Sequence, residues 1–375
     1  MRRLNRGFSM IELMVAVVLG LLVTGAIISV FAGSRSAYQS TSGVAALADS
    51  GRFALDTMEE SSRGAGYVAC NHATPVTSAS VLNEISSPLA YDFRYGVGGY
   101  EAAGTGPGGA VGLPAIPVAG AGAGNWTPNL DATFTGATNQ QVLASDVLVL
   151  RSNVPRVTPA YTTADVGVGA GSFQVANAGA LQAGQLAVIS DCTKSVAFQI
   201  SNVAGGTPAT VHFDGATGAP GNASISLPMA FSAGAVVSPL TTTVYYIGVG
   251  ADGDSALRRL DLLNGLVGAT VFTDQEVVPD VENMQILYGV DTNNTQMASA
   301  YVTADQVLTI NPGVIDFSNV VSVKIAVLSA SATGAAPIPA AAPTFTLLGT
   351  TVTAPRDTRL RKVFEATITL RNTVR

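Results

Sequence analysis

The feature that most constrains this chain is an apolar run near its N-terminus. Between Phe8 and Ala32 the only charged side chain is Glu12, and three arginines precede the run. As a helix, the 23 residues from Phe8 to Val30 would span roughly 35 Å, which is enough to cross a bilayer. The basic flank predicts a cytoplasmic N-terminus, with the rest of the chain beyond the inner membrane, in the periplasm.

A secretory signal peptide and a plain membrane anchor are alternative explanations of this pattern. The apolar run is longer than the core of a usual signal peptide, and no clear cleavage site of the small-x-small kind follows it. Glu12 fits neither explanation well, because a carboxylate near the membrane centre costs about 2.5–3.5 kcal/mol. We therefore expect Glu12 to lie near one interface and to meet a cation there.

The stretch Gly7-Phe-Ser-Met-Ile-Glu12-Leu13 resembles the class III signal of type IV pilins and type II secretion pseudopilins. The resemblance implies that residues 1–7 are a leader, and that a prepilin peptidase cuts between Gly7 and Phe8 and N-methylates Phe8. It also gives Glu12 an assembly role. Four residues of helix separate its carboxylate from the new amine by about 6 Å. Pairing with the Phe8 ammonium of a neighbouring subunit would offset the burial of the acid.

The helix is predicted to continue into water after Ser34. Apolar or small residues recur there at intervals of three and four, which is typical of a helix with one buried face. They are Val44, Leu47, Gly51, Leu55 and Met58. Glycines at positions 64 and 66 end the pattern. The prediction is one helix over 8–62, with 8–32 in the membrane or the filament core and the outer half packed on a globular domain.

Residues 63–375 are predicted to form a β-rich periplasmic domain. Short apolar or alternating runs bounded by turn-forming residues indicate strands at 147–150, 186–189, 196–200, 320–328 and 364–370. Residues 244–249 and 257–262 flank the turn former Gly250-Ala-Asp-Gly-Asp254 and predict a hairpin. The predicted fold class is α+β, with one long N-terminal helix packed on a mainly antiparallel sheet.

Two stretches rich in glycine, alanine or proline interrupt these strands. Residues 91–126 and 331–343 contain few side chains that could form a core, so we predict flexible loops on the surface. The first of these is treated as an insert in the periplasmic domain.

Charge and cysteine content narrow the possible functions. The chain carries 19 Lys and Arg against 25 Asp and Glu, and loss of the three leader arginines would change the net charge from −6 to −9. An acidic chain without a basic tract lacks the electrostatic footprint of a nucleic-acid-binding protein.

The two cysteines, Cys70 and Cys192, are expected to form one disulfide in an oxidising compartment; two separate buried thiols are the alternative.

The sequence contains little that points to catalysis, so no enzyme is predicted. There are two histidines, and the phosphate-binding, nucleophile-elbow and metalloprotease motifs are absent. No cofactor is expected. The weak calcium candidates are Asp252 and Asp254 in one turn and Asp291 and Asn293 in another; neither turn has EF-hand spacing, and ordinary turn chemistry is favoured.

The later strands are similar to the PilW family of minor pilins. The similar segments are Val278–Asp291, Ser190-Asp-Cys192, Tyr245-Tyr-Ile-Gly248 and Arg359-Leu-Arg-Lys-Val-Phe364 with its closing Leu370-Arg-Asn372. The resemblance implies a low-abundance subunit of a type IV pilus that helps to initiate or prime assembly and contributes to twitching motility and adhesion. Its implied partners are prepilin peptidase, other minor pilins, the major pilin and a PilY-type adhesin. The protein would move from the inner membrane into the extracellular pilus.

Two other functions remain open. A minor pseudopilin of type II secretion, closest to the J type, would carry the same leader, because both systems share the peptidase. A membrane-anchored adhesin could use exposed loops in 91–126, although that stretch lacks the aromatic density of a sugar-binding surface.

Overall fold

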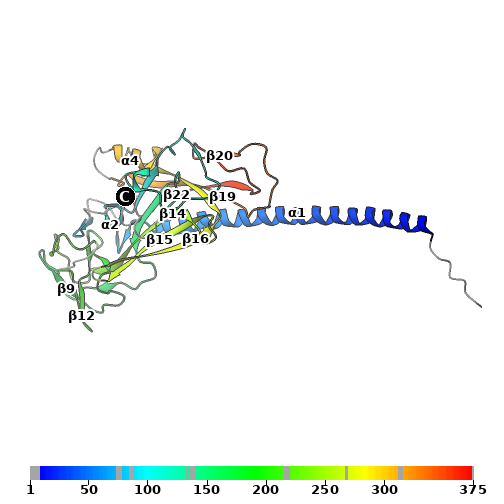
Figure 1. Cartoon of the computed structure of the whole chain (residues 1–375). Coiled ribbons are helices and arrows are strands. Elements are labelled where there is room, and N and C mark those ends of the chain that lie inside the picture. The colour runs from blue at the N-terminus through cyan, green and yellow to red at the C-terminus, as the bar shows by residue number, and fades with distance from the viewer. Residues whose placement is uncertain are drawn as a thin grey trace, which may run out of the picture.

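The computed structural model describes residues 9–72, 78–83, 88–131, 134, 141–214, 220–266, 269–310 and 316–373. A single helix, α1 (Met10–Gly64, 55 residues), leads into a domain made mainly of strands. The N-terminal half of α1 projects from the domain as a rod, and its C-terminal half lies against the sheets (Figure 1). The helix bounds agree with the prediction of 8–62 within two residues. One long helix followed by a domain made mainly of strands confirms the predicted α+β fold class.

The largest sheet has ten strands and runs in the order β3-β11-β10-β14-β7-β4-β6, while β15 and β8 pair with β14 and β16 pairs with β15. Its strands are β3 (Ser78–Ser80), β4 (Val97–Ala102), β6 (Trp126–Thr127), β7 (Val147–Asn153), β8 (Ala160–Tyr161), β10 (Leu186–Ser190), β11 (Ser195–Gln199), β14 (Val236–Val249), β15 (Ser255–Leu266) and β16 (Ala269–Pro279). The long strand β14 joins the two ends of this sheet: its first residues pair with β10, and its later residues pair with β7 and β15.

A second sheet has four antiparallel strands in the order β18-β17-β19-β22. These are β17 (Val281–Val290), β18 (Ala300–Val302), β19 (Val320–Ala330) and β22 (Arg361–Thr369). The remaining elements are short: β1 (Tyr67–Val68), β2 (Asn71–His72), α2 (Pro88–Tyr91), β5 (Ala110–Gly112), η1 (Ala123–Asn125), β9 (Ser172–Val175), β12 (Asn202–Gly205), β13 (Ala209–His212), α4 (Ala304–Ile310), β20 (Thr344–Leu347) and β21 (Thr350–Thr353).

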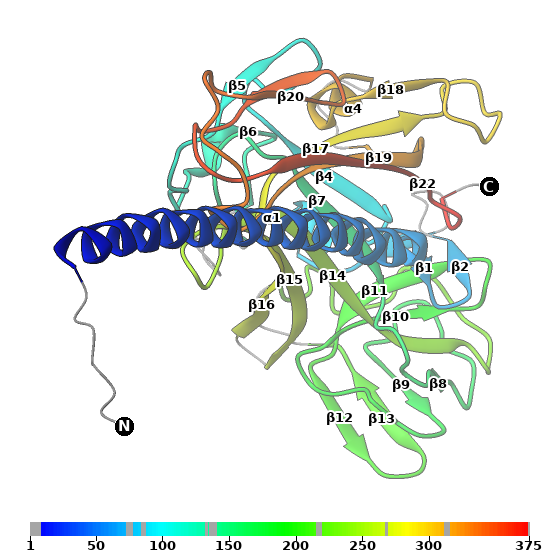
Figure 2. The ribbon, with the colours of Figure 1, turned by 90° about the vertical axis from the view of Figure 1, so that its right-hand side faces the viewer.

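The C-terminal half of α1 crosses the face of the domain between β22 and the β15–β16 hairpin (Figure 2). Glycine allows the closest approach. A Cβ added at Gly51 would lie 2.2 Å from ring carbons of Phe364 on β22, and one at Gly43 would lie 2.7 Å from the Cβ of Ala335. Val44, predicted to belong to the buried face, is 53% exposed, so that part of the prediction was wrong. At this end of the helix the buried face is shifted by one residue from the predicted one, because the small Gly43, and not Val44, contacts the 331–343 loop.

The described residues contain three hydrophobic clusters, and the two larger ones form the cores. The larger one lies beneath α1 and joins both sheets. The smaller one is built around Phe173, Phe198 and Phe213, whose rings lie 5.2–6.1 Å apart, and it fills a lobe formed by β8–β13. This lobe lies below the main body in both views, to the side of α1 (Figures 1 and 2).

The predicted strands are confirmed where apolar alternation was strong. Residues 244–249 and 257–262 form the β14–β15 hairpin, with Val249 opposite Ser255 across the turn. In β22 the even-numbered residues from 364 face inward and the odd-numbered ones are exposed, as the alternation predicted. Such strands are readable from sequence because one face is buried and the other meets water.

The prediction that 91–126 is a surface insert was wrong at both ends of the segment. Tyr91, Tyr100 and Trp126 are each at most 2% exposed, and β4 lies within the large sheet. Its glycines create space: a Cβ at Gly99 would lie 1.7 Å from the hydroxyl of Tyr288. Glycine therefore serves here to admit a large side chain from another sheet, a contact that composition does not reveal. The middle of the segment, around β5, is largely exposed, as predicted.

Candidate assembly interface

The N-terminal half of α1 presents an uncovered apolar surface. An 18-residue window of this helix has a mean hydropathy of 2.7, and none of that window is buried. Within the described residues, α1 is the one helix long and apolar enough to cross a membrane. Met10 is 84% exposed and Phe31 is 69% exposed. Apolar area on this scale is stable only in lipid or against other helices, so this half of α1 is a membrane anchor or a helix-packing surface.

At the tip of the helix, Ser9 and Glu12 form a capping box. The backbone N–H of Glu12 donates to Ser9 Oγ at 3.2 Å, and the backbone N–H of Ser9 donates to Glu12 Oε2 at 3.0 Å. These bonds satisfy two N–H groups that the first turn of a helix leaves unpaired. The pattern Ser-x-x-Glu was visible in the sequence, but its capping role was missed. Gly7 and Phe8 lie outside the described residues, so cleavage, methylation and the Glu12–Phe8 pairing stay predictions.

The other end of α1 is held by polar contacts from distant parts of the chain. Ser61 Oγ lies 2.7 Å from the hydroxyl of Tyr245 on β14, and the Asn372 side chain donates to the carbonyl of Ala65 at 3.1 Å. Burial raises the pKa of Tyr245, so its hydroxyl stays protonated. The backbone N–H of Gly66 donates to Arg151 O on β7 at 2.8 Å. The helix is therefore fixed to the sheet at its base, while its apolar half is free to enter an assembly.

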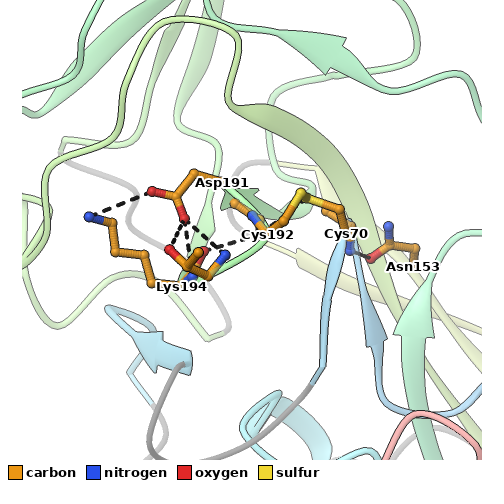
Figure 3. Close-up of a disulfide and its surroundings, with 8 residues drawn as sticks. Cys70, Asn153, Asp191, Cys192 and Lys194 are labelled. Carbon is orange, nitrogen blue, oxygen red and sulfur yellow. Dashed lines mark hydrogen bonds and ion pairs between the residues drawn. A yellow bond between two sulfur atoms is a disulfide. The ribbon is translucent and has the colours of Figure 1, made fainter.

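The predicted disulfide between Cys70 and Cys192 is present, with the two Cα atoms 4.6 Å apart (Figure 3). Cys70 lies in the turn between β1 and β2, shortly after the end of α1, and Cys192 lies in the turn between β10 and β11. Asp191 shapes that turn by accepting hydrogen bonds from Thr193 and from the backbone N–H of Lys194. The bond therefore joins the main body to the sheet end that carries the smaller core, across a sequence separation of 122 residues.

The first pair of calcium candidates lies in a network of ion pairs. The guanidinium of Arg359 bonds to Asp254 and, at 2.9 Å, to Asp280. Arg361 makes two bonds to Glu282, at 2.6 and 2.9 Å, and also contacts Asp357. Asp252 accepts the backbone N–H of Asp254, as expected for a turn residue. Of the two candidates, Asp254 thus meets a cation of the chain itself, and Asp252 accepts a backbone hydrogen bond within the turn.

The second pair of calcium candidates forms a turn of its own. The carboxylate of Asp291 accepts backbone N–H groups from Asn293, Thr295 and Gln296 at 2.6–3.1 Å. Loss of hydration acts to raise the pKa of Asp291, but the backbone hydrogen bonds together outweigh it and lower the pKa below its usual value. Among the described residues, no group of three or more His, Cys, Asp or Glu side chains is placed to hold a metal ion. Calcium binding at either turn remains untested.

A buried pair of carboxyl groups, which sequence analysis missed, lies at the seam between the two sheets. Asp146 accepts the backbone N–H of Ala102 on β4 at 2.9 Å and that of Ile286 on β17 at 2.8 Å. Glu101 is 6% exposed, accepts a bond from Thr105, and has its Oε2 without a hydrogen bond. Burial, and then the neighbouring carboxyl of Asp146, raise the pKa of Glu101 well above its usual range. We therefore expect Glu101 to be protonated at neutral pH.

Comparison of the N-terminal segment with known protein families indicates the class of protein. Residues 2–28 match the prokaryotic N-terminal methylation motif, which covers the predicted cleavage site and the exposed half of α1 as far as residue 28. The chain therefore carries a prepilin-type signal at the start of its apolar helix, as the sequence predicted.

The second match covers about a third of the chain. Residues 244–372, from within β14 to just beyond β22, match the family model described as Type IV Pilus-assembly protein W, PilW, so this region is similar to a PilW domain. This region contains the four-stranded sheet, the β14–β15 hairpin and the ion-pair network. A solved structure of a type IV-like pilin from Thermus thermophilus is similar at 19% identity over 52% of this chain and 86% of that one, with a TM-score of 0.22, too low to support an argument. The comparison with curated proteins found no match.

Proposed function

We propose that this protein is a minor pilin of a type IV pilus that helps to initiate or prime pilus assembly. The observation that carries the proposal is the combination, in one chain, of an N-methylation motif, an uncovered apolar helix and a PilW domain. The protein acts by packing and not by catalysis. Its partners are prepilin peptidase, other minor pilins, the major pilin and a PilY-type adhesin, and it contributes through the pilus to twitching motility and adhesion.

In this proposal, the N-terminal helix is the part of the chain that is processed and that enters the filament. Prepilin peptidase cleaves between Gly7 and Phe8 and methylates Phe8, while the rest of the chain lies in the periplasm. The apolar half of α1 then leaves the bilayer and exchanges lipid contacts for contacts with other helices. Glu12 sets the register by pairing with the Phe8 amine of a neighbour. Its capping bond to the Ser9 N–H gives the carboxylate a partner before assembly.

Two variants test this proposal. Glu12→Ala is expected to be produced and processed but to yield few pili, because its carboxylate no longer sets the register; normal piliation would contradict the role of Glu12. Gly7→Ala is expected to retain the leader. Mass spectrometry of the N-terminal peptide measures this, and a methylated Phe8 terminus in that variant would overturn the assigned cleavage site.

A deletion strain separates the pilus from type II secretion, since the leader is shared by both. The proposal expects loss of twitching and of surface pili with normal exoprotein secretion. Loss of secretion with normal pili would assign the protein to the secretion system instead.

A further inference from the structure

A cavity of about 610 Å³ is lined in part by the 331–343 loop, which contacts α1 at Gly43. One wall comes from the loop that follows β5, and the other from residues 142–144 and from Thr333 and Pro355. Thr333 belongs to the loop whose Ala335 meets Gly43 of α1. A partner subunit that packs along the projecting half of α1 would therefore reach the mouth of this cavity.

The walls of the cavity are apolar and incompletely covered. Leu113, Pro114 and Pro117 line it, together with Val118 and Leu143, which are 71% and 55% exposed. Ile116, in the same loop, is 74% exposed. An exposed apolar rim around a concave surface is typical of a binding site for another molecule.

The floor of the cavity is charged, and the charges do not balance. The network residues that line the cavity are two guanidinium groups, Arg359 and Arg361, and three carboxylates, Asp254, Glu282 and Asp357. One negative charge therefore remains. The side chain of Arg361 is 2% exposed, whereas that of Asp254 is 41% exposed, so the excess negative charge is accessible at Asp254 beside its contact with Arg359. A cation is the complement of such a floor.

We propose that this cavity is a socket for a lysine or arginine side chain carried on an apolar segment of another pilus subunit. The inference rests on the proposed function and deepens it by naming the partner chemistry. The cationic group would bond to Asp254 and its neighbours, while the apolar residues on either side cover Val118 and Leu143. The volume admits a few side chains, which suits a helix face or a loop and excludes a whole domain.

A photo-cross-linking residue at Leu143 of the full-length protein, expressed in piliated cells, tests the socket. Leu143 is on the rim, and half of it is exposed, so the replacement leaves the ion-pair network intact. Mass spectrometry of the adducts is expected to map them to a pilus-subunit segment with a Lys or Arg among apolar residues. The same cross-linker at Ile225, which is 64% exposed and outside the cavity, is the matched control and is expected to give no such adduct.

A variant that removes one charge provides a second test of the socket. Asp254→Asn keeps the shape of the turn but removes one negative charge, and it is expected to lower the yield of the Leu143 adduct roughly threefold, the effect of one partly exposed ion pair. An intact Cys70–Cys192 bond and an unchanged melting temperature show that the variant is folded. The socket is refuted by adducts only with lipid, by adducts with a segment that lacks a basic residue, by the absence of a protein adduct, or by a yield that Asp254→Asn leaves unchanged.

This experiment also separates the two proposals. If the protein co-purifies with pilus subunits and Leu143 gives no basic-segment adduct, the socket is wrong and the function stands. If Leu143 cross-links to a basic segment of a type II secretion subunit, the cationic recognition holds, and the assignment to the pilus fails.

Discussion

The fit of α1 on the sheet makes Gly51→Ala the most informative single substitution. Gly51 lies where the helix crosses β22, and a Cβ there would be 2.2 Å from the ring carbons Cδ2 and Cε2 of Phe364. Carbon atoms need 3.5–4.0 Å, so the helix must move outward by more than 1 Å, or the ring must leave its position. Either response changes the direction in which the projecting half of α1 leaves the domain.

The expected loss of stability can be worked out from two opposing effects. Overpacking of a well-packed contact costs typically about 1–3 kcal/mol. Replacing glycine by alanine inside a helix gains about 1 kcal/mol in helix propensity. Because the approach of 2.2 Å is a severe overlap, the overpacking cost lies in the upper half of its range, about 2–3 kcal/mol. The net change is then a loss of about 1–2 kcal/mol in the free energy of unfolding, which lowers the melting temperature by a few degrees in a domain of this size.

Thermal unfolding of the full-length protein in detergent measures this loss. Trp126 is the one tryptophan of the chain and is 2% exposed, so its fluorescence reports on the main core. Gly64→Ala is the matched control, because a Cβ there would meet no atom within 4 Å. That variant is expected to keep or slightly raise the melting temperature.

A double substitution isolates the contact. Phe364→Leu shortens the facing side chain, so in its background Gly51→Ala is expected to cost at least about 1 kcal/mol less than it does alone. If Gly51→Ala is as stable as the wild type, or if its cost is the same in both backgrounds, the helix does not sit on Phe364 as described and the reasoning fails.

Three further predictions concern the rest of the domain. Burial raises the pKa of Glu101 to about 9, so its contribution to stability is full below the pKa of an unfolded glutamate, about 4, and is lost as pH rises from there to about 9. Glu101→Gln should flatten that fall in urea titrations by up to about 1.4 kcal/mol per pH unit. An equal slope in both proteins would count against this. Replacing Cys70 and Cys192 by serine is expected to cost about 2–4 kcal/mol in the same assay, and a smaller loss would mean that packing alone fixes the joined regions. Calcium at millimolar concentration is expected to leave the melting temperature unchanged, because no three His, Cys, Asp or Glu side chains among the described residues are placed to hold a metal ion; a calcium-dependent rise that Asp254→Asn or Asp291→Asn abolishes would establish a site.

The capping box at Ser9 and the register of β22 show what local sequence can reveal. Both depend on residues within a few positions of one another, and the spacing alone specifies them. The apolar half of α1 could also be predicted from local sequence, because its length and composition are enough to indicate a helix that needs lipid or other helices around it. The motif around Gly7 and Glu12 likewise predicted a class of protein that the matched N-methylation motif confirms.

The socket and the buried carboxyl pair could not be read in this way. Arg359 and Arg361 meet carboxylates from separate turns and from strand β17, and Asp146 accepts hydrogen bonds from backbone groups of β4 and β17 that lie 184 residues apart. Their partners depend on which strands become neighbours in the fold. The glycines of β4 misled the sequence analysis for the same reason, because the side chain they admit belongs to another sheet.

The sequence by itself therefore determined that this chain carries a prepilin-type signal on a long apolar helix and continues into an antiparallel β-rich domain, and it favoured one disulfide over two free thiols. Each of these follows from periodicity, from the compartment or from a short motif. The tertiary structure decided which face of α1 meets the sheets, that Tyr91 to Ala102 belongs to the core, and where uncompensated charge meets an open cavity. Those features arise from contacts between residues far apart in the chain. The sequence pattern around each residue does not show which distant residues it will contact, so these features become visible only in the folded structure.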